Sequence, residues 1–98
     1  MNEEEVKKII EKIMHPEIDA SLVDLGMIEN VKLKGNKVSL TMVFPFPGVP
    51  IKYMLMESVE KPLKKAGLEV EIKERTMNQD ELQKFFKMEQ EKMEGDVI

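Results

Sequence analysis

The 98-residue sequence contains no cysteine. This absence excludes disulfide bonds, thiolate metal sites and cysteine nucleophiles from the chain. Only one histidine is present, so a zinc site built within one chain would need carboxylates for its other ligands. No apolar run approaches the roughly 20 residues that a membrane-spanning helix requires, and we expect no membrane partner.

Basic residues are fewer than acidic residues. Lysine and arginine number 15 against 19 aspartates and glutamates, which gives a formal net charge of -4. Such a chain does not attract phosphate backbones as a whole, so we expect no nucleic acid partner. The first residues, MNEEEVKK, are acidic where a signal peptide would be basic. The sequence therefore predicts a cytoplasmic protein.

The residues that are present suit one small folded domain. Hydrophobic residues make up 42% and charged residues 35% of the chain, a balance typical of globular proteins. A chain of this length forms one domain with a small core. We predict a single domain over residues 1–95 and a frayed tail over residues 96–98.

The N-terminal segment has the apolar spacing of an amphipathic helix. Asn2 and Glu5 are placed to form a capping box at its start, in which each side chain accepts the other residue's backbone N–H. Pro16 disfavours helical geometry in the residue before it, so we expect this helix to end at His15.

Two further segments carry helical spacing. The first has Pro50 in its first turn and ends at Gly67, and Pro62 inside it predicts a kink or an early break. The second has another capping pair, Asn78 and Glu81, at its start. Its predicted inner face consists of Leu82, Phe85, Phe86 and Met93.

Between the helices lie three runs with the period-2 alternation of strands. The runs over residues 28–33 and 38–44 are separated by KGNK, which predicts a hairpin with a Gly-Asn turn. The third run covers residues 68–74 and follows the second helix, so it should lie parallel to the second strand. The order helix, strand, strand, helix, strand, helix predicts an α+β, two-layer α/β sandwich. Its small three-stranded mixed sheet should have the helices mainly on one face.

Few side chains outside the predicted core suggest chemistry. A triad of Ser21, His15 and an aspartate lacks the Gly-x-Ser-x-Gly elbow that would support it. The loop carboxylates Glu17, Asp19 and Asp24 do not have the spacing of a calcium loop, and capping or solvent-facing roles are favoured for them. We predict no catalytic residue and no metal ligand within this chain.

The sequence FPFPGVP, residues 44–50, joins the second strand to the second helix. Its prolines fix three backbone torsions, and Gly48 allows the chain to turn. The backbone N–H groups of Val49 and Ile51 are expected to point outward from the positive end of the helix, where an anion or a soft ligand could bind. A rigid apolar connection without a ligand is the alternative interpretation.

Two motifs in order resemble the PaaD/SufT-like family, also known as domain of unknown function fifty-nine. HPEIDASLVDLGMI, residues 15–28, is similar to the family's Asp-Pro-Glu-Ile and Asp-Leu-Gly-Leu-Val elements. PGVP, residues 47–50, stands where the family has Pro-x-Cys-Pro at a helix start. Members are small cytosolic proteins of iron-sulfur cluster assembly, and the resemblance covers nearly the whole chain.

The sequence departs from the family pattern at two positions. His15 stands where the family usually has aspartate, and Val49 stands where it has the cysteine thought to handle iron or a cluster. Valine offers no lone pair to a metal. The resemblance therefore implies a protein that binds no cluster alone and meets one only transiently or with a partner. The role of His15 is left open.

The resemblance implies an accessory factor, not an enzyme, that docks iron-sulfur scaffold, carrier or client proteins. Its predicted binding surface consists of Pro47, Gly48, Val49 and Pro50, with Glu17 and Asp24 beside them. The alternatives are a non-catalytic subunit of a multicomponent oxygenase, as in the PaaD branch, or a regulatory relative that has lost metal handling. An exposed edge strand and a methionine-rich last helix leave a homodimer open.

Overall fold

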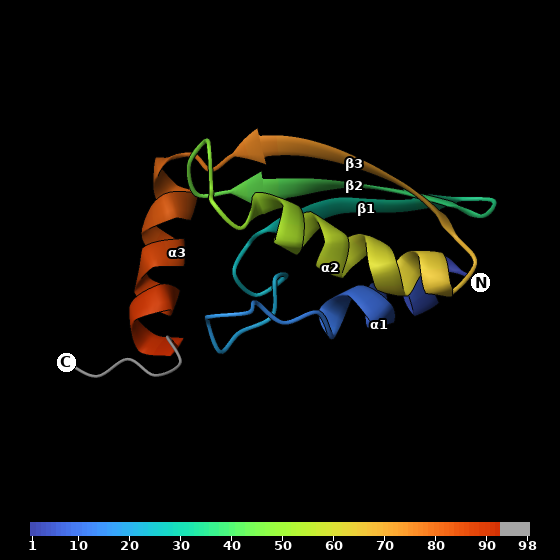
Figure 1. The fold of residues 1–98 in the computed structure, drawn as a ribbon, viewed down its shortest axis with the longest axis horizontal. Coiled ribbons are helices and arrows are strands. Elements are labelled where there is room, and N and C mark those ends of the chain that lie inside the picture. Colours follow the sequence, from blue (N-terminus) through green and yellow to red (C-terminus); the bar gives the residue numbers. More distant parts are fainter. Residues whose placement is uncertain (93–98) are drawn as a thin grey trace.

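The computed structural model describes residues 1–92, in which three helices and three strands follow the predicted order (Figure 1). The expected tail and the inner-face position of Met93 lie outside the described residues. The elements are α1 (Glu3–Glu11), β1 (Ile28–Lys34), β2 (Lys37–Phe44), α2 (Lys52–Lys65), β3 (Glu69–Thr76) and α3 (Gln79–Lys92). None of the helices within residues 1–92 is long and apolar enough to cross a membrane.

The sheet is mixed, with β2 in the centre. Strands β1 and β2 are antiparallel, and the two-residue turn Gly35–Asn36 joins them. Gly35 has φ +61° and Asn36 is not among the residues with positive φ, as expected for a type II′ turn. Strands β2 and β3 are parallel over their full lengths, from Lys37 beside Glu69 to Phe44 beside Thr76. The predicted hairpin and the predicted parallel pair are both confirmed.

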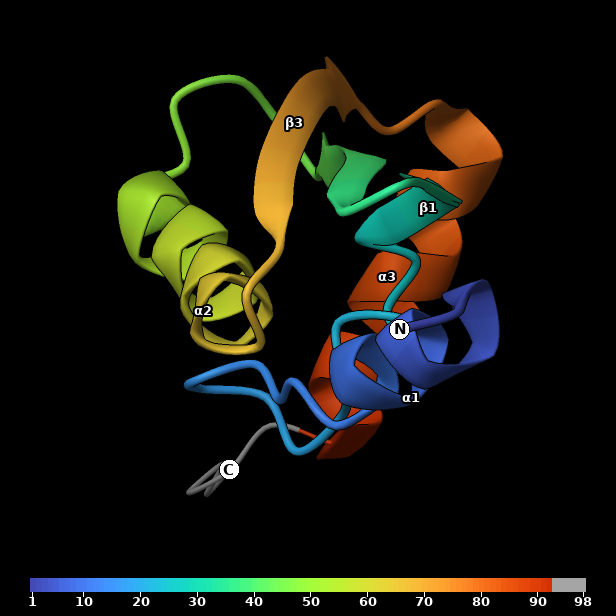
Figure 2. The same ribbon diagram turned by 90° about the vertical axis from the view of Figure 1, so that its right-hand side faces the viewer.

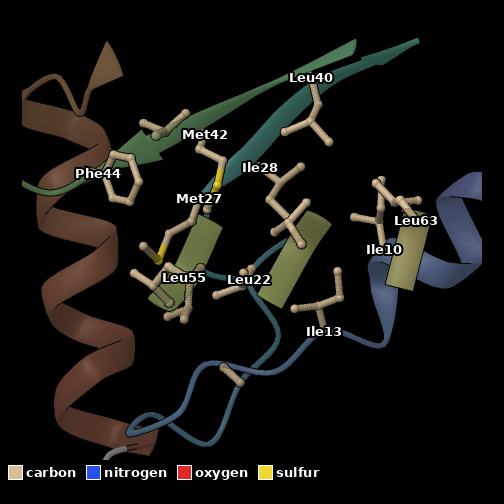
Figure 3. Close-up of a cluster of buried hydrophobic side chains, with 14 of the residues drawn as sticks. Ile10, Ile13, Leu22, Met27, Ile28, Leu40, Met42, Phe44, Leu55 and Leu63 are labelled. Atoms are coloured by element: carbon tan, nitrogen blue, oxygen red, sulfur yellow. The ribbon is translucent and has the colours of Figure 1, made fainter. Parts of the chain in front are cut away.

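Two of the three helices lie on one face of the sheet, as predicted. Helices α1 and α2 cover this face, and α3 stands across the end where β2 and β3 finish (Figures 1 and 2). The buried side chains between the sheet and α2 come from alternate positions of β2 and from one stripe of the helix (Figure 3). They are Val38, Leu40, Met42 and Phe44, with Leu55, Val59 and Leu63.

The first helix is shorter than predicted. The Asn2–Glu5 capping box is present, but the helix ends at Glu11 and not at His15. The apolar spacing predicted a longer helix, but residues 13–15 pair with residues 20–22 in a narrow two-stranded loop and so cannot continue the helix. In this loop His15 N donates to the oxygen of Ala20 (3.0 Å) and Leu22 N donates to the oxygen of Ile13 (2.9 Å).

The limits of α2 also differ from the prediction. The helix begins at Lys52, so Pro50 lies in the turn before it and not in its first turn. The expected early break at Pro62 is wrong, because the helix continues to Lys65. Pro62 is followed by only three more helical residues, and burial of Leu63 among them stabilises this last turn.

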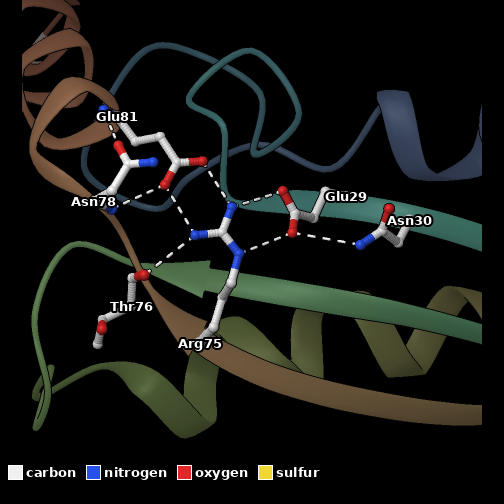
Figure 4. Close-up of polar contacts among 6 residues, drawn as sticks. All are labelled: Glu29, Asn30, Arg75, Thr76, Asn78 and Glu81. Atoms are coloured by element: carbon white, nitrogen blue, oxygen red, sulfur yellow. Dashed lines mark hydrogen bonds and ion pairs between the residues drawn. The ribbon is translucent and has the colours of Figure 1, made fainter.

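One charged network ties α3 to the sheet (Figure 4). The Arg75 guanidinium donates two hydrogen bonds to the Glu29 carboxylate on β1 (2.8 and 2.8 Å) and two to Glu81 on α3 (2.9 and 2.6 Å). Glu81 also completes the predicted capping box with Asn78. Arg75 on β3 pairs with Val43 on β2, so both side chains lie on the same face of the sheet. Val43 alternates with Met42 and Phe44, which face α2, and the network therefore lies over the opposite face.

Acid should weaken this network through Glu81. Hydrogen bonds from Arg75 and from the Asn78 backbone lower the Glu81 pKa from 4.5 to about 2. Since the folded-state pKa is depressed, the stabilisation is complete above pH ~4.5 and is lost as the pH falls towards 2. We expect the urea midpoint of the wild type to fall more steeply over this window than that of Glu81→Gln. Asp80→Asn, one residue away without the Arg75 contact, should keep the wild-type slope, and equal slopes for all three proteins would contradict this role.

Candidate functional site

The proline-rich connection between β2 and α2 is partly anchored and partly exposed. Pro45 is buried, whereas the side chain of Phe46 is 47% exposed. Gly48 has φ +75°, a conformation that residues with a β-carbon rarely adopt, so this turn requires glycine. The N–H groups of Val49 and Ile51 form no hydrogen bond within residues 1–92, and no side chain caps the helix that follows.

A cavity of about 340 Å³ lies where this connection meets the loop after α1 and the side of α3. We refer to it as the junction cavity. Its lining is mostly apolar and comes from segments far apart in the sequence. The lining residues are His15, Glu17, Met27, Pro45, Phe46, Val49, Pro50, Ile51, Leu55, Phe85, Phe86 and Glu89.

The junction cavity brings together three of the six predicted binding residues. Glu17 from the first motif lies in the same lining as Val49 and Pro50 from the second. Pro47 and Gly48 instead line a smaller neighbouring cavity of about 170 Å³, together with Lys52 and the end of β3. Phe46 lines both cavities and separates the two groups of predicted residues.

Asp24, the sixth predicted binding residue, is exposed and lines neither cavity. Its backbone N–H donates to the Ser21 hydroxyl (3.0 Å), and Gly26 after it has φ +75°. This part of the first motif therefore shapes a turn that delivers Met27 to the junction cavity. The Ser21 hydroxyl accepts this turn bond and its residue is buried, so its environment is that of a structural serine.

His15 has a structural role that explains how it replaces the family's aspartate. Its Nδ1 accepts hydrogen bonds from the backbone N–H groups of Glu17 (3.0 Å) and Ile18 (3.1 Å). An aspartate side chain makes the same kind of bond to the N–H groups that follow it in a turn. Because Nδ1 is an acceptor, the neutral ring carries its proton on Nε2.

The junction cavity has few donors for a metal ion. The Nδ1 lone pair of His15 is used by backbone amides, and Nε2 carries the ring proton. Val49 stands at the position of the family's cysteine, and its side chain has no atom that can bind a metal. Across residues 1–92, no three His, Cys, Asp or Glu side chains are grouped as metal ligands.

Sequence reasoning missed the contribution of α3 to the site. Phe85 and Phe86 were both expected on the inner face, but only Phe85 is buried and Phe86 is 44% exposed. Their rings meet edge to face with centroids 6.0 Å apart. Neighbouring residues on a helix point about 100° apart, so two consecutive phenylalanines cannot both face the core. That geometry is the signal that could have placed Phe86, with Glu89 one turn away, at the edge of a site.

The chain thus has a small α+β fold with a largely apolar cavity where three of its segments meet. A sequence model of the family described as "Iron-sulfur cluster assembly protein" matches residues 3–73. The chain belongs to this family, and the predicted PaaD/SufT-like membership is confirmed. The match ends before Arg75 and α3, so Phe86 and Glu89 lie outside it.

Two known proteins resemble the chain. An iron-sulfur cluster carrier protein of Synechocystis sp. (strain ATCC 27184 / PCC 6803 / Kazusa) is 36% identical over 59 residues. These residues are 60% of this chain but only 17% of that protein, so the chain corresponds to a small part of it. The crystal structure of a domain of unknown function, DUF59, from Bacillus anthracis has the same fold, with a TM-score of 0.68. It is 21% identical and the match covers 81% of each chain.

The His15 hydrogen bonds predict a loss of stability in mild acid. Burial lowers the His15 pKa below 6.5, and the nearby Glu17 opposes this only in part. Because the folded-state pKa is depressed, the stabilisation is complete above pH ~6.5 and is lost as the pH falls below it. His15 is the single histidine, so a loss of unfolding free energy between about pH 7 and pH 5 in urea titrations reports on it.

Two variants distinguish the loss of the hydrogen-bond acceptor at position 15 from its protonation. His15→Asp keeps an acceptor that stays ionised in this window, and should remove the loss between about pH 7 and pH 5. His15→Leu should lower the unfolding free energy by about 1–3 kcal/mol at neutral pH, because the N–H of the buried Ile18 loses its partner. A pH profile of His15→Asp identical to that of the wild type would refute this assignment.

Proposed function

We propose that this protein is an accessory factor in iron-sulfur cluster assembly or transfer that acts by docking other proteins and holds no cluster itself. Membership of the iron-sulfur cluster assembly family supports the process. The observation that carries the docking mechanism is the position of Val49. It replaces the family's cysteine and lies in the lining of an apolar cavity instead of among metal ligands.

The junction cavity has the features of a protein-binding surface. Its rim carries two aromatic side chains, Phe46 and Phe86, that are each nearly half exposed. Aromatic residues are enriched at protein interfaces, where they provide large contact areas at low entropic cost. The surface lies on a loop that prolines and a positive-φ glycine hold in one shape, so docking would require little ordering of the loop.

The docking partners in this proposal are iron-sulfur scaffold, carrier or client proteins in the cytoplasm. The curated relative is a carrier protein, and this chain corresponds to only a small part of it. The cluster in this proposal is cargo that passes between partners.

Charged substitutions in the junction cavity should weaken docking. We expect Phe46→Asp and Val49→Asp each to reduce the affinity for a purified iron-sulfur carrier or scaffold of the native host at least tenfold, as measured by calorimetry. Each change would place an unpaired carboxylate against an apolar partner surface. Tyr53→Asp is the matched control, because Tyr53 is 79% exposed on α2 and lies outside the junction cavity. If no carrier or scaffold of the host binds the wild type, the docking role fails.

A thiol at position 49 distinguishes this proposal from that of a relative that has lost metal handling. If the chain retains the rest of an ancestral site, Val49→Cys should acquire iron or a cluster on anaerobic reconstitution with iron and sulfide. If the site is built for docking, the variant should stay colourless between about 300 and 450 nm, like the wild type, because neither His15 nitrogen offers a free lone pair. Stable cluster absorbance in Val49→Cys would favour the lost-site alternative.

A further inference from the structure

The charged groups in the lining of the junction cavity are of one sign. Glu17 comes from the loop after α1 and Glu89 comes from α3, and no lysine or arginine is among the lining residues. Within residues 1–92, neither carboxylate takes part in an ion pair. By contrast, glutamates on the sheet do form ion pairs, such as Glu71 with Lys37 and Glu74 with Lys52.

Apart from His15, the rest of the lining consists of apolar residues. Met27 and Leu55 are buried, Ile51 is half-buried, and the exposed rings of Phe46 and Phe86 stand at the rim. A ligand for this site therefore needs an apolar body for the interior and a cation that can reach the carboxylates. A lysine or arginine side chain can also lay its aliphatic stem on apolar surface, and it is attracted to the faces of aromatic rings.

We propose that the junction cavity binds a segment of a partner protein in which a bulky apolar side chain lies beside a lysine or arginine. This inference rests on the proposed docking function and specifies the chemistry of the partner. The same carboxylates disfavour an acidic segment, because like charges brought together at an interface cost affinity. The volume of about 340 Å³ suits a few side chains of such a segment.

One of the two exposed rings and one of the two carboxylates of the junction cavity come from the C-terminal part of the chain. Phe86 and Glu89 belong to α3, which follows the residues that match the family. Helix α3 is held in place by the Glu81–Arg75 bonds and by the buried Phe85, and its last described carbonyl, on Lys92, accepts from Asp19 N (2.6 Å). The family core thus supplies the loops of the cavity, and α3 adds an aromatic ring and a negative charge that select the partner.

Two short blocked peptides test the charge preference on the full-length protein. One has the sequence acetyl-Gly-Phe-Lys-Phe-Gly-amide, and in the other glutamate replaces the lysine. We expect the lysine peptide to shift the amide NMR signals of the non-proline residues within 15–18, 46–51 and 86–89. Its dissociation constant should be at least about fivefold lower than that of the glutamate peptide, and this difference should shrink as salt is added.

Matched variants connect the preference to the two carboxylates. Glu17→Gln and Glu89→Gln should each weaken binding of the lysine peptide about two- to fivefold, the range of a rim ion pair, and narrow the difference between the peptides. Glu91→Gln is the control, since Glu91 is an exposed carboxylate on the same helix outside the lining. Equal binding of the two peptides, shifts confined to other surfaces, or no shifts at all would overturn the proposal.

The charge preference and the docking function can fail independently of each other. If a carrier or scaffold binds the junction cavity but neither glutamine variant changes its affinity, the charge preference is wrong and the docking role stands. If no carrier or scaffold binds while the lysine peptide does, the cavity recognises an apolar and basic segment of a protein outside cluster assembly.

Discussion

The C-terminal end of β2 is the constraint on which the site depends. Val43 N donates to the oxygen of Met27 (2.8 Å), so this end of the strand fixes the last part of the first motif. Met77 N donates to the oxygen of Phe44 (2.8 Å), which fixes the entry to α3. The proline-rich connection then leaves directly from Phe44. Three segments that are distant in the sequence therefore converge at one strand end, and the burial of β2 between its neighbours holds that end in place.

The two departures from the family pattern have different physical consequences. Replacing aspartate by His15 preserves the hydrogen bonds of the turn, because Nδ1 accepts from the same kind of backbone N–H groups. It changes only the pH range over which the acceptor exists. Valine at position 49 leaves Gly48 and the prolines of the loop in place, but it offers no lone pair to a metal. The two differences from the family pattern therefore act on different properties, the first on a turn and the second on the donors that the loop offers.

The sequence predicted the order of elements, both strand pairings and both capping boxes, because apolar periodicity and capping residues act locally. It misplaced the end of α1, since the loop after Glu11 is held by bonds to residues 20–22, which no local pattern reports. Of the predicted binding residues, Glu17, Val49 and Pro50 share one lining, while Pro47 and Gly48 line the neighbouring cavity. The motifs could not show that Asp24 lies outside both cavities or that Glu89 lines the junction cavity, because both positions depend on where turns and a distant helix place side chains.

The absence of a thiol at position 49 and the negative charge of the lining are consistent with one docking role. A cysteine that binds iron needs a site in which other ligands can approach the metal, and such a site must stay polar enough to admit them. With Val49 in that position, a partner protein would gain binding free energy mainly by burying apolar surface, at about 25 cal/mol per Å² of apolar area. Hydrophobic contact alone discriminates poorly between partners, because it is not directional. The carboxylates Glu17 and Glu89 would then supply the discrimination, since they penalise every partner that does not bring a cation to the rim.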